Sequence, residues 1–225
     1  MHFTTRKLLF RAANTLRINR YFHRLTPLKI TAKETDLISP VEAKLQAVVP
    51  YSHDHICIIK NKQINLTQQL GDDAHKFDNG TVCSFYLAPA NKHFRLMPAS
   101  GTVVHLHAQS GTAKYFQTLL GAEKIIRHLP YLRHHNLLQK ALTRNATHTT
   151  ILKTPHGHLA LIAIGSLGVN HIHCTLERWK EYQQWAIAGR FAIGSSFLLV
   201  ASKGYTIRTN IWKVELGVPI GGSKN

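Results

Sequence analysis

Prolines divide most of this chain into short pieces, which limits it to a fold built from short elements. Seven of them follow residue 39, at positions 40, 50, 89, 98, 130, 155 and 219. Between them, apolar or alternating stretches predict strands. These stretches lie at 41–49, 55–60, 81–87, 102–107, 151–153, 159–164, 169–176 and 197–201, with a hairpin turn at 155–157. The pattern lacks strand–helix–strand alternation, so it predicts an α+β fold with a mainly antiparallel β-sheet and excludes a Rossmann domain.

Two stretches in the middle of the chain have the apolar spacing of helices. They lie at 113–128 and 133–144 and are separated by Pro130. Proline ends a helix because it lacks the backbone N–H and clashes with the preceding turn. We therefore expect two separate helices here.

The N-terminal segment, residues 1–33, is strongly basic. It carries eight lysines and arginines and no acidic residue, and apolar side chains are interleaved with the basic ones. This composition predicts an amphipathic helix that lies on an anionic phospholipid membrane. Two alternatives stay open: a solvated helix packed on the following domain, and a mitochondrial transit peptide.

Composition excludes several classes of protein. The 225 residues are 44% hydrophobic and 17% charged, which excludes a disordered polyelectrolyte. Three cysteines without a CxxC pair exclude a disulfide scaffold, and no apolar run is long enough to span a bilayer. The net charge of +17 favours an anionic partner. Specific nucleic-acid binding is not expected, because regular aromatic interleaving is missing.

Histidines form four H-x-H pairs, at 53/55, 105/107, 156/158 and 171/173. Residues two apart on a strand point to the same face, so each pair could begin a metal site. Nearby carboxylates are scarce, however, and a zinc site needs three or four converging ligands. We expect no metal and interpret these histidines as surface or partly buried side chains.

The most informative segment is GRFAIGSS at residues 189–196, directly before the apolar run at 197–200. By itself it indicates a turn into a strand, because glycine and serine favour turns. Three other segments accompany it in order: YLAP at 86–89, continuing to His93, Met97-Pro98 and Gly101; LTRN at 142–145; and AIGSLGV at 163–169. As an ordered set, the four segments resemble the motifs of the phosphatidylserine decarboxylase family over residues 36–220.

The resemblance implies a chain that cleaves itself between Gly194 and Ser195. The Ser195 hydroxyl would attack the Gly194 carbonyl, and the released C-terminal fragment would carry a covalent pyruvoyl group made from Ser195. His93 matches the histidine that the family associates with decarboxylation. Glu42, within PVEA at 40–43, takes the place of an aspartate that assists cleavage.

Three residues depart from the family pattern, and two of them, Leu96 and less seriously Glu42, weaken the cleavage machinery. Leu96 replaces the second histidine of the motif, which is the usual base for the cleaving serine, and Lys92 replaces the tyrosine before His93. Leucine cannot accept a proton, so another group must serve as the base; His93, His105 and His107 are the nearby candidates. Removing a general base slows such a step without forbidding it, so we expect slow or incomplete cleavage.

The function implied by the resemblance is that of a lyase. It would convert phosphatidylserine to phosphatidylethanolamine and CO₂, with the pyruvoyl group as electron sink. We expect the basic segment 1–33 to precede a decarboxylase-like domain, 34–225, cut into portions 34–194 and 195–225. The expected location is peripheral, on the cytoplasmic face of a bacterial inner membrane or, alternatively, on the mitochondrial inner membrane; a homodimer is compatible with this interpretation. The alternative function is a non-processing member that serves as a basic structural, lipid-binding or RNA-binding protein.

Overall fold

The structure is a computed structural model that describes residues 32–88, 91–111, 136–165, 172–191, 195–209 and 212–224. Almost all of the basic segment 1–33, and the helix expected at 113–128, lie outside these residues. Within the described ranges, no helix is long and apolar enough to cross a membrane.

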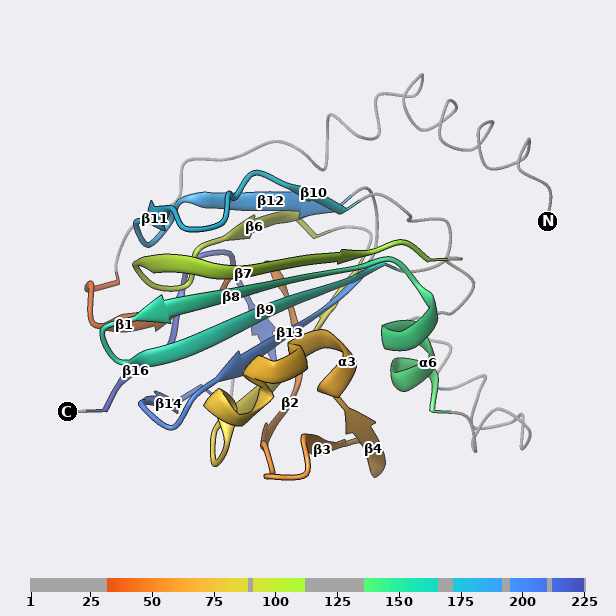
Figure 1. Cartoon of the computed structure of the whole chain (residues 1–225). Coiled ribbons are helices and arrows are strands. Elements are labelled where there is room, and N and C mark those ends of the chain that lie inside the picture. Colours follow the sequence, from red (N-terminus) through yellow and green to blue (C-terminus); the bar gives the residue numbers. More distant parts are fainter. Residues whose placement is uncertain are drawn as a thin grey trace, which may run out of the picture.

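The body of the described fold is an eight-stranded antiparallel sheet (Figure 1). Its strand order is β11-β7-β8-β9-β13-β5-β2-β15. In chain order these strands are β2 (Ala43–Pro50), β5 (Thr81–Leu87), β7 (Gly101–Gln109), β8 (Thr147–Thr154), β9 (Gly157–Gly165), β11 (Glu181–Tyr182), β13 (Ser195–Ala201) and β15 (Lys213–Val214). The last long strand to enter, β13, is therefore inserted between β9 and β5 in the middle of the sheet.

Smaller sheets and helices complete the described part of the chain. One three-stranded sheet joins β10 (Ile172–Cys174), β12 (Ile187–Phe191) and β6 (Phe94–Leu96). A second joins β1 (Asp36–Ile38), β16 (Pro219–Ser223) and β14 (Tyr205–Ile207). The hairpin of β3 (Ile56–Ile59) and β4 (Lys62–Asn65) is followed by helices α3 (Thr67–Leu70) and η1 (Gly71–Phe77), and α6 (Leu137–Arg144) precedes β8.

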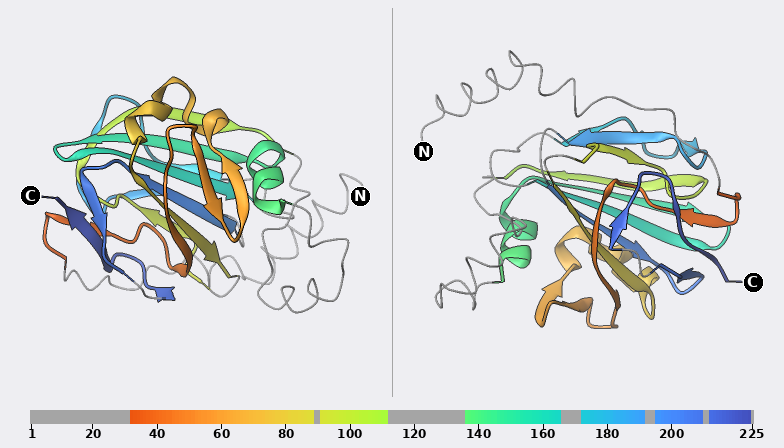
Figure 2. Two further views of the ribbon diagram at one scale, coloured as in Figure 1. Left: turned by 90° about the horizontal axis from the view of Figure 1, so that it is seen from below. Right: turned by 180° about the vertical axis from the view of Figure 1, so that it is seen from behind.

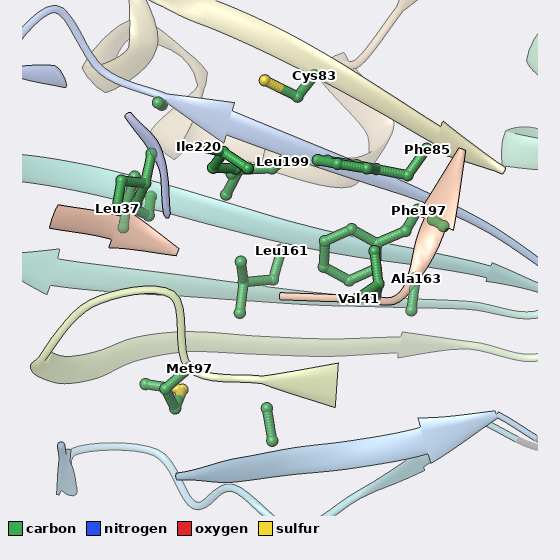
Figure 3. Close-up of a cluster of buried hydrophobic side chains, with 14 of the residues drawn as sticks. Leu37, Val41, Cys83, Phe85, Met97, Leu161, Ala163, Phe197, Leu199 and Ile220 are labelled. Atoms are coloured by element: carbon green, nitrogen blue, oxygen red, sulfur yellow. The ribbon is translucent and has the colours of Figure 1, made fainter. Parts of the chain in front are cut away.

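These elements cover both faces of the main sheet (Figure 2). The β10-β12-β6 sheet lies over one face, and β3, β4, α3, η1 and α6 lie on the other (Figure 1). On the first face, Phe85 and Phe197 meet edge to face with ring centroids 6.2 Å apart. Figure 3 shows Phe197 and Leu161 pointing toward the layer that carries Met97. The core therefore has two layers, one on each side of the sheet.

β13 is buried on both faces, which explains its continuous apolar sequence. Phe197 and Leu199 belong to one core layer, whereas Leu198 and Val200 belong to the other. A strand covered on both sides needs apolar residues at successive positions rather than at alternate ones. The apolar run that predicted this strand is thus the signature of its central place.

The predicted fold class is confirmed: the described chain is mainly antiparallel sheet with few helices. Strands were expected at the places of β2, β3, β5, β7, β8, β9, β10 and β13; all are present, β5 with the predicted ends and the others with shifted ends. The helix expected at 133–144 is found as α6, whose N-cap residue Asn136 accepts a hydrogen bond from the Gln139 N–H. The segment interpreted as a turn at 189–191 is instead part of strand β12.

Candidate active site

Ser195 is the first residue of β13 and enters the main sheet between two strand ends. Its backbone pairs with Leu87 at the end of β5 and with Gly165 at the end of β9. Gly194 and the side chain of Ser195 lie outside the described part of the chain. The backbone position of Ser195 is nevertheless fixed, because strands hold it on both sides.

The LTRN segment reaches Ser195 through Gly165. Asn145 is fully buried, and its Nδ2 donates to the Gly165 carbonyl oxygen at 2.8 Å. The Gly165 N–H donates in turn to the carbonyl oxygen of Ala146, also at 2.8 Å. Because Gly165 pairs with Ser195, two of the four motif segments meet at the start of β13.

Glu42 lies at the same end of the sheet, on the other side of Ser195. Lys44 of β2 is opposite Tyr86 of β5, and Tyr86 is opposite Ser196. Glu42 directly precedes β2, so it lies at the end of the sheet where β13 begins. Two interstrand spacings separate the β2 and β13 backbones, which is about 10 Å.

The carboxylate of Glu42 contacts the loop that follows β5. Asn91 Nδ2 donates to Glu42 Oε1 at 3.2 Å, while Asn91 Oδ1 accepts from the Ala88 N–H at 2.8 Å. Lys92 Nζ lies 3.7 Å from Glu42 Oε2. Lys92, which replaces the tyrosine of the family pattern, is thus the cation beside Glu42 and offsets its negative charge.

His93 is fully buried next to the segment that leads into Ser195. The Phe191 N–H donates to the His93 carbonyl oxygen at 2.9 Å, and Phe191 precedes Ser195 by four residues. β6 begins directly after His93 and pairs with β12. The pairing of these two strands therefore anchors His93 near the predicted cleavage site.

Leu96 lies in an apolar environment. It is fully buried and packs in a cluster with Phe94, Leu216 and the partly buried Trp185. Its N–H donates to the carbonyl oxygen of Pro40 at 2.9 Å, so its backbone lies beside the segment that carries Glu42. The position is therefore close to the cleavage machinery, but nothing in the Leu96 side chain can take up a proton.

The structure does not bring His105 or His107 to Ser195. Both lie on β7, three strands from β13. Through the pairing of β7, β8, β9 and β13, His105 is level with Val200 and His107 with Leu198. Both are therefore displaced along the sheet as well as across it, which removes them as candidates for the base.

His148, on β8, is a site histidine that the sequence analysis missed. It is opposite Ala163, which is opposite Phe197, so His148 lies two strands from β13 and on the face of the first core layer. Burial, together with the positive charge of Arg95, lowers the pKa of His148 to about 4. The strand was predicted to start at 151, so the sequence did not place this residue on the sheet.

A cavity of about 280 Å³ opens beside His148. Its lining includes Gln109 at the end of β7, Ala146 and Thr147 at the start of β8, and Ile172 of β10. The carbonyl oxygen of Ala146 is the one that accepts from Gly165, the neighbour of Ser195. The cavity therefore lies at the end of the sheet where the four motif segments gather.

This end of the sheet combines an internal serine at the head of the central strand with a buried asparagine, a carboxylate and a buried histidine. These residues belong to the segments that resemble the motifs of the phosphatidylserine decarboxylase family. A profile described as phosphatidylserine decarboxylase matches residues 20–222. The chain belongs to the phosphatidylserine decarboxylase family, which confirms the resemblance.

Bacterial proteins named phosphatidylserine decarboxylase proenzyme are similar to most of the chain. The one from Anoxybacillus flavithermus is 28% identical over 191 residues, which cover 82% of this chain and 66% of the relative. Those from Marinobacter nauticus and a Geobacillus strain are each 26% identical, covering 77% and 85% of this chain and 63% and 69% of the relatives. The chain thus spans about two thirds of the length of these relatives.

Proposed function

We propose that this chain is a lyase that converts phosphatidylserine to phosphatidylethanolamine and CO₂, using a pyruvoyl group made from Ser195. One observation carries the proposal: residues from separate motif segments gather at one end of the sheet. They are Ser195, Gly165, Asn145, Glu42 and His93. The substrate is taken from the names of relatives in the same family.

The backbone around Ser195 suits a group formed from the chain itself. Because β5 and β9 both pair with Ser195, cleavage before this residue leaves the new N-terminus held by the sheet. The hydroxyl of the next residue, Ser196, is buried and has no hydrogen-bond partner among the described residues. A pyruvoyl group supplies a carbonyl that accepts the electrons left when CO₂ departs.

We assign Glu42 to the cleavage step. It lies at the end of the sheet where β13 begins with Ser195, and its carboxylate is oriented by Asn91. Because Leu96 cannot act as a base, Glu42 supports the cleavage step only through its negative charge. Lys92 partly offsets that charge. We infer that the cleavage is slow, because a positioned general base typically contributes 10²-fold or more.

We assign His93 to the decarboxylation step. Its imidazole is buried, and its backbone is tied to Phe191 on the segment that enters the site. A side chain held in this way can move a proton at the reacting carbon without help from bulk water. His93 would therefore act after cleavage, as the family motif implies.

The proposed substrate and the composition of the basic segment both support a location at a membrane surface. Residues 1–33 combine apolar and basic side chains without an acidic one. We propose that this segment binds anionic lipid at the cytoplasmic face of a bacterial inner membrane, where the substrate headgroup is presented to the domain.

A decarboxylation assay tests the function. Purified full-length protein is incubated with phosphatidylserine labelled at its carboxyl carbon, and released CO₂ is measured against Ser195→Ala. We expect release by the wild type and none by Ser195→Ala. Equal CO₂ release by the wild type and Ser195→Ala would remove Ser195 from the mechanism. If a fully cleaved wild type released no CO₂, phosphatidylserine would be excluded as the substrate.

The alternative is a non-processing member, in which the apolar surroundings of Leu96 would leave Ser195 without a base. Such a chain would keep the fold and its positive charge and would bind anionic lipid or RNA without chemistry. The names of the relatives favour the enzyme instead.

A further inference from the structure

Arg95 is a fully buried arginine on β6, an edge strand of the β10-β12-β6 sheet. Arg95 of β6 is opposite Gly189 of β12, which is opposite Cys174 of β10. Its guanidinium crosses over Gly189, where an added Cβ would lie 2.5 Å from Arg95 Nη2. Nη2 donates to the carbonyl oxygen of His173 at 2.9 Å. Gly189 is therefore the residue that makes room for this side chain.

The charge of Arg95 is not balanced by the described chain. No aspartate or glutamate among the described residues forms an ion pair with it, and its Nε and Nη1 have no hydrogen-bond partner there. Burial lowers the pKa of Arg95 to about 10, so the guanidinium remains a cation at neutral pH. The partners of Arg95 are the carbonyl oxygens of His173 and Ala188 and the ring of Phe191. A buried cation without an anionic partner is strongly unfavourable, which indicates a missing anion.

The nearest described space for an anion is the cavity at the start of β8, whose lining does not include Arg95 itself. The cavity of about 280 Å³ is lined by His148 and Ile172, among others. Arg95 contributes to lowering the pKa of His148 and bonds to His173, which is the next residue after Ile172. The guanidinium of Arg95 is thus bonded to the neighbour of one cavity residue, and its strand β6 belongs to the small sheet that lies over the main sheet (Figure 1).

The same arginine is linked to the reaction centre by aromatic rings. Its guanidinium carbon lies 5.5 Å from the ring centroid of Phe191, and the rings of Phe191 and Phe197 are 6.5 Å apart. Phe197 follows Ser195 by two residues on β13. An anion held by Arg95 would therefore lie on the side of the sheet that carries the motif segments.

We propose that Arg95 and His148 form the anion-binding end of the substrate site and take a phosphate group, in the substrate a phosphodiester of the lipid headgroup. Guanidinium N–H groups bind phosphate oxygens well, and Nε and Nη1 are the nitrogens without a partner among the described residues. They lie on different edges of the guanidinium, so one phosphate takes one of them together with the second N–H of Nη2. A neutral imidazole at His148 adds one further N–H donor. The assignment of the phosphate to a lipid rests on the proposed function, whereas the binding of phosphate does not.

Phosphate binding is measured by the shift in thermal midpoint of the full-length chain, at matched ionic strength in chloride. The probes are inorganic phosphate, free serine and short-chain phosphatidylserine. Two variants change the site: Arg95→Met removes the charge, and Arg95→Lys keeps the charge but loses the guanidinium N–H donors. A third variant, Arg190→Met, removes an exposed arginine from β12. Arg190→Met controls for diffuse binding by a chain of net charge +17.

We expect inorganic phosphate and the short-chain lipid to stabilise the wild type and Arg190→Met, with binding weakened about 10-fold or more in Arg95→Met and less in Arg95→Lys. Free serine, which lacks phosphate, should stabilise none of them. A second measurement needs no variant at position 95: by NMR, phosphate should raise the pKa of the His148 imidazole, because it neutralises Arg95.

Equal stabilisation of Arg95→Met and wild type, a response to serine alone, or an unchanged pKa of His148 would overturn the inference. Response to inorganic phosphate but not to the lipid would assign the site to a free phosphate. The wild type could prove uncleaved and inactive and still bind phosphate, with weaker binding in Arg95→Met. That result would exclude the proposed function but would support the phosphate site.

Discussion

At the scale of single residues, His93 combines full burial with a backbone contact that a side-chain change leaves in place. We predict that His93→Ala lowers the turnover of cleaved protein by about 10²-fold or more, because a positioned proton donor is lost. Turnover per cleaved chain is measured, with the exposed His75→Ala as control. Full activity in His93→Ala would remove His93 from the reaction.

The lowered pKa of His148 predicts that the stability of the fold depends on pH. Its pKa is about 4 in the folded chain and about 6.5 in the unfolded chain, so the unfolded chain takes up a proton first as the pH falls. The free energy of unfolding should therefore decrease by about 2 kcal/mol from pH 7.5 to pH 5 through this residue alone. Urea unfolding at both values, compared with His148→Gln, isolates the contribution; an identical decrease in the variant would contradict it.

Motif matching found residues that local sequence identifies, such as Ser195, Glu42 and His93. It could not find the contact of Lys92 with Glu42 or the proximity of Arg95 to His148. Both depend on strand register between segments about 50 residues apart, and register is not encoded in any one segment. Nearness in sequence also suggested His105 and His107 as bases. This was wrong, because the strand register places both of them away from Ser195.

At the scale of elements, the junction of α6 and β9 should matter for cleavage beyond its effect on stability. Asn145→Ala removes the bond to the Gly165 carbonyl and should lower the free energy of unfolding by about 1–3 kcal/mol. Because Gly165 positions Ser195, cleavage should also slow by roughly 10-fold or more.

The matched control is Asn136→Ala, which removes the N-cap of α6 at a cost of about 0.5–2 kcal/mol. Its cleavage rate, followed by gel densitometry in the folded protein, should equal that of wild type. Equal slowing in both variants would mean that stability alone sets the rate.

Long, buried strands were predictable because their composition reflects their surroundings. β5, β9 and β13 are covered on both faces and have nearly continuous apolar sequences. β6 and β12 were missed: β6 has a buried arginine at its centre, and β12 contains Gly189 with φ +142°, which favours a turn in the sequence. Their pairing with each other is what makes them strands.

At the scale of the whole molecule, the uneven charge predicts where the chain binds. Deleting residues 1–24, which carry six of the basic residues and no acidic one, should abolish co-sedimentation with anionic vesicles at moderate salt. Circular dichroism should show the same fold in the deleted chain. Unchanged co-sedimentation would assign membrane binding to the remaining domain.

The central claim is that Ser195 becomes the N-terminus of a separate chain. The measurement is the intact mass of purified full-length protein, compared with Ser195→Ala, Leu96→His and Leu96→Gln. Leu96→Gln is the matched control, because it places a polar group without a base in the same buried site, at a similar cost of about 1–3 kcal/mol.

We predict two chains in the wild type, 1–194 and 195–225, the second carrying a pyruvoyl group, beside some uncut precursor. Ser195→Ala should stay uncut, and Leu96→His should cleave faster than wild type and Leu96→Gln, because a buried imidazole beside the Glu42 segment can accept the Ser195 proton. A single intact chain in both the wild type and folded Leu96→His would contradict the claim.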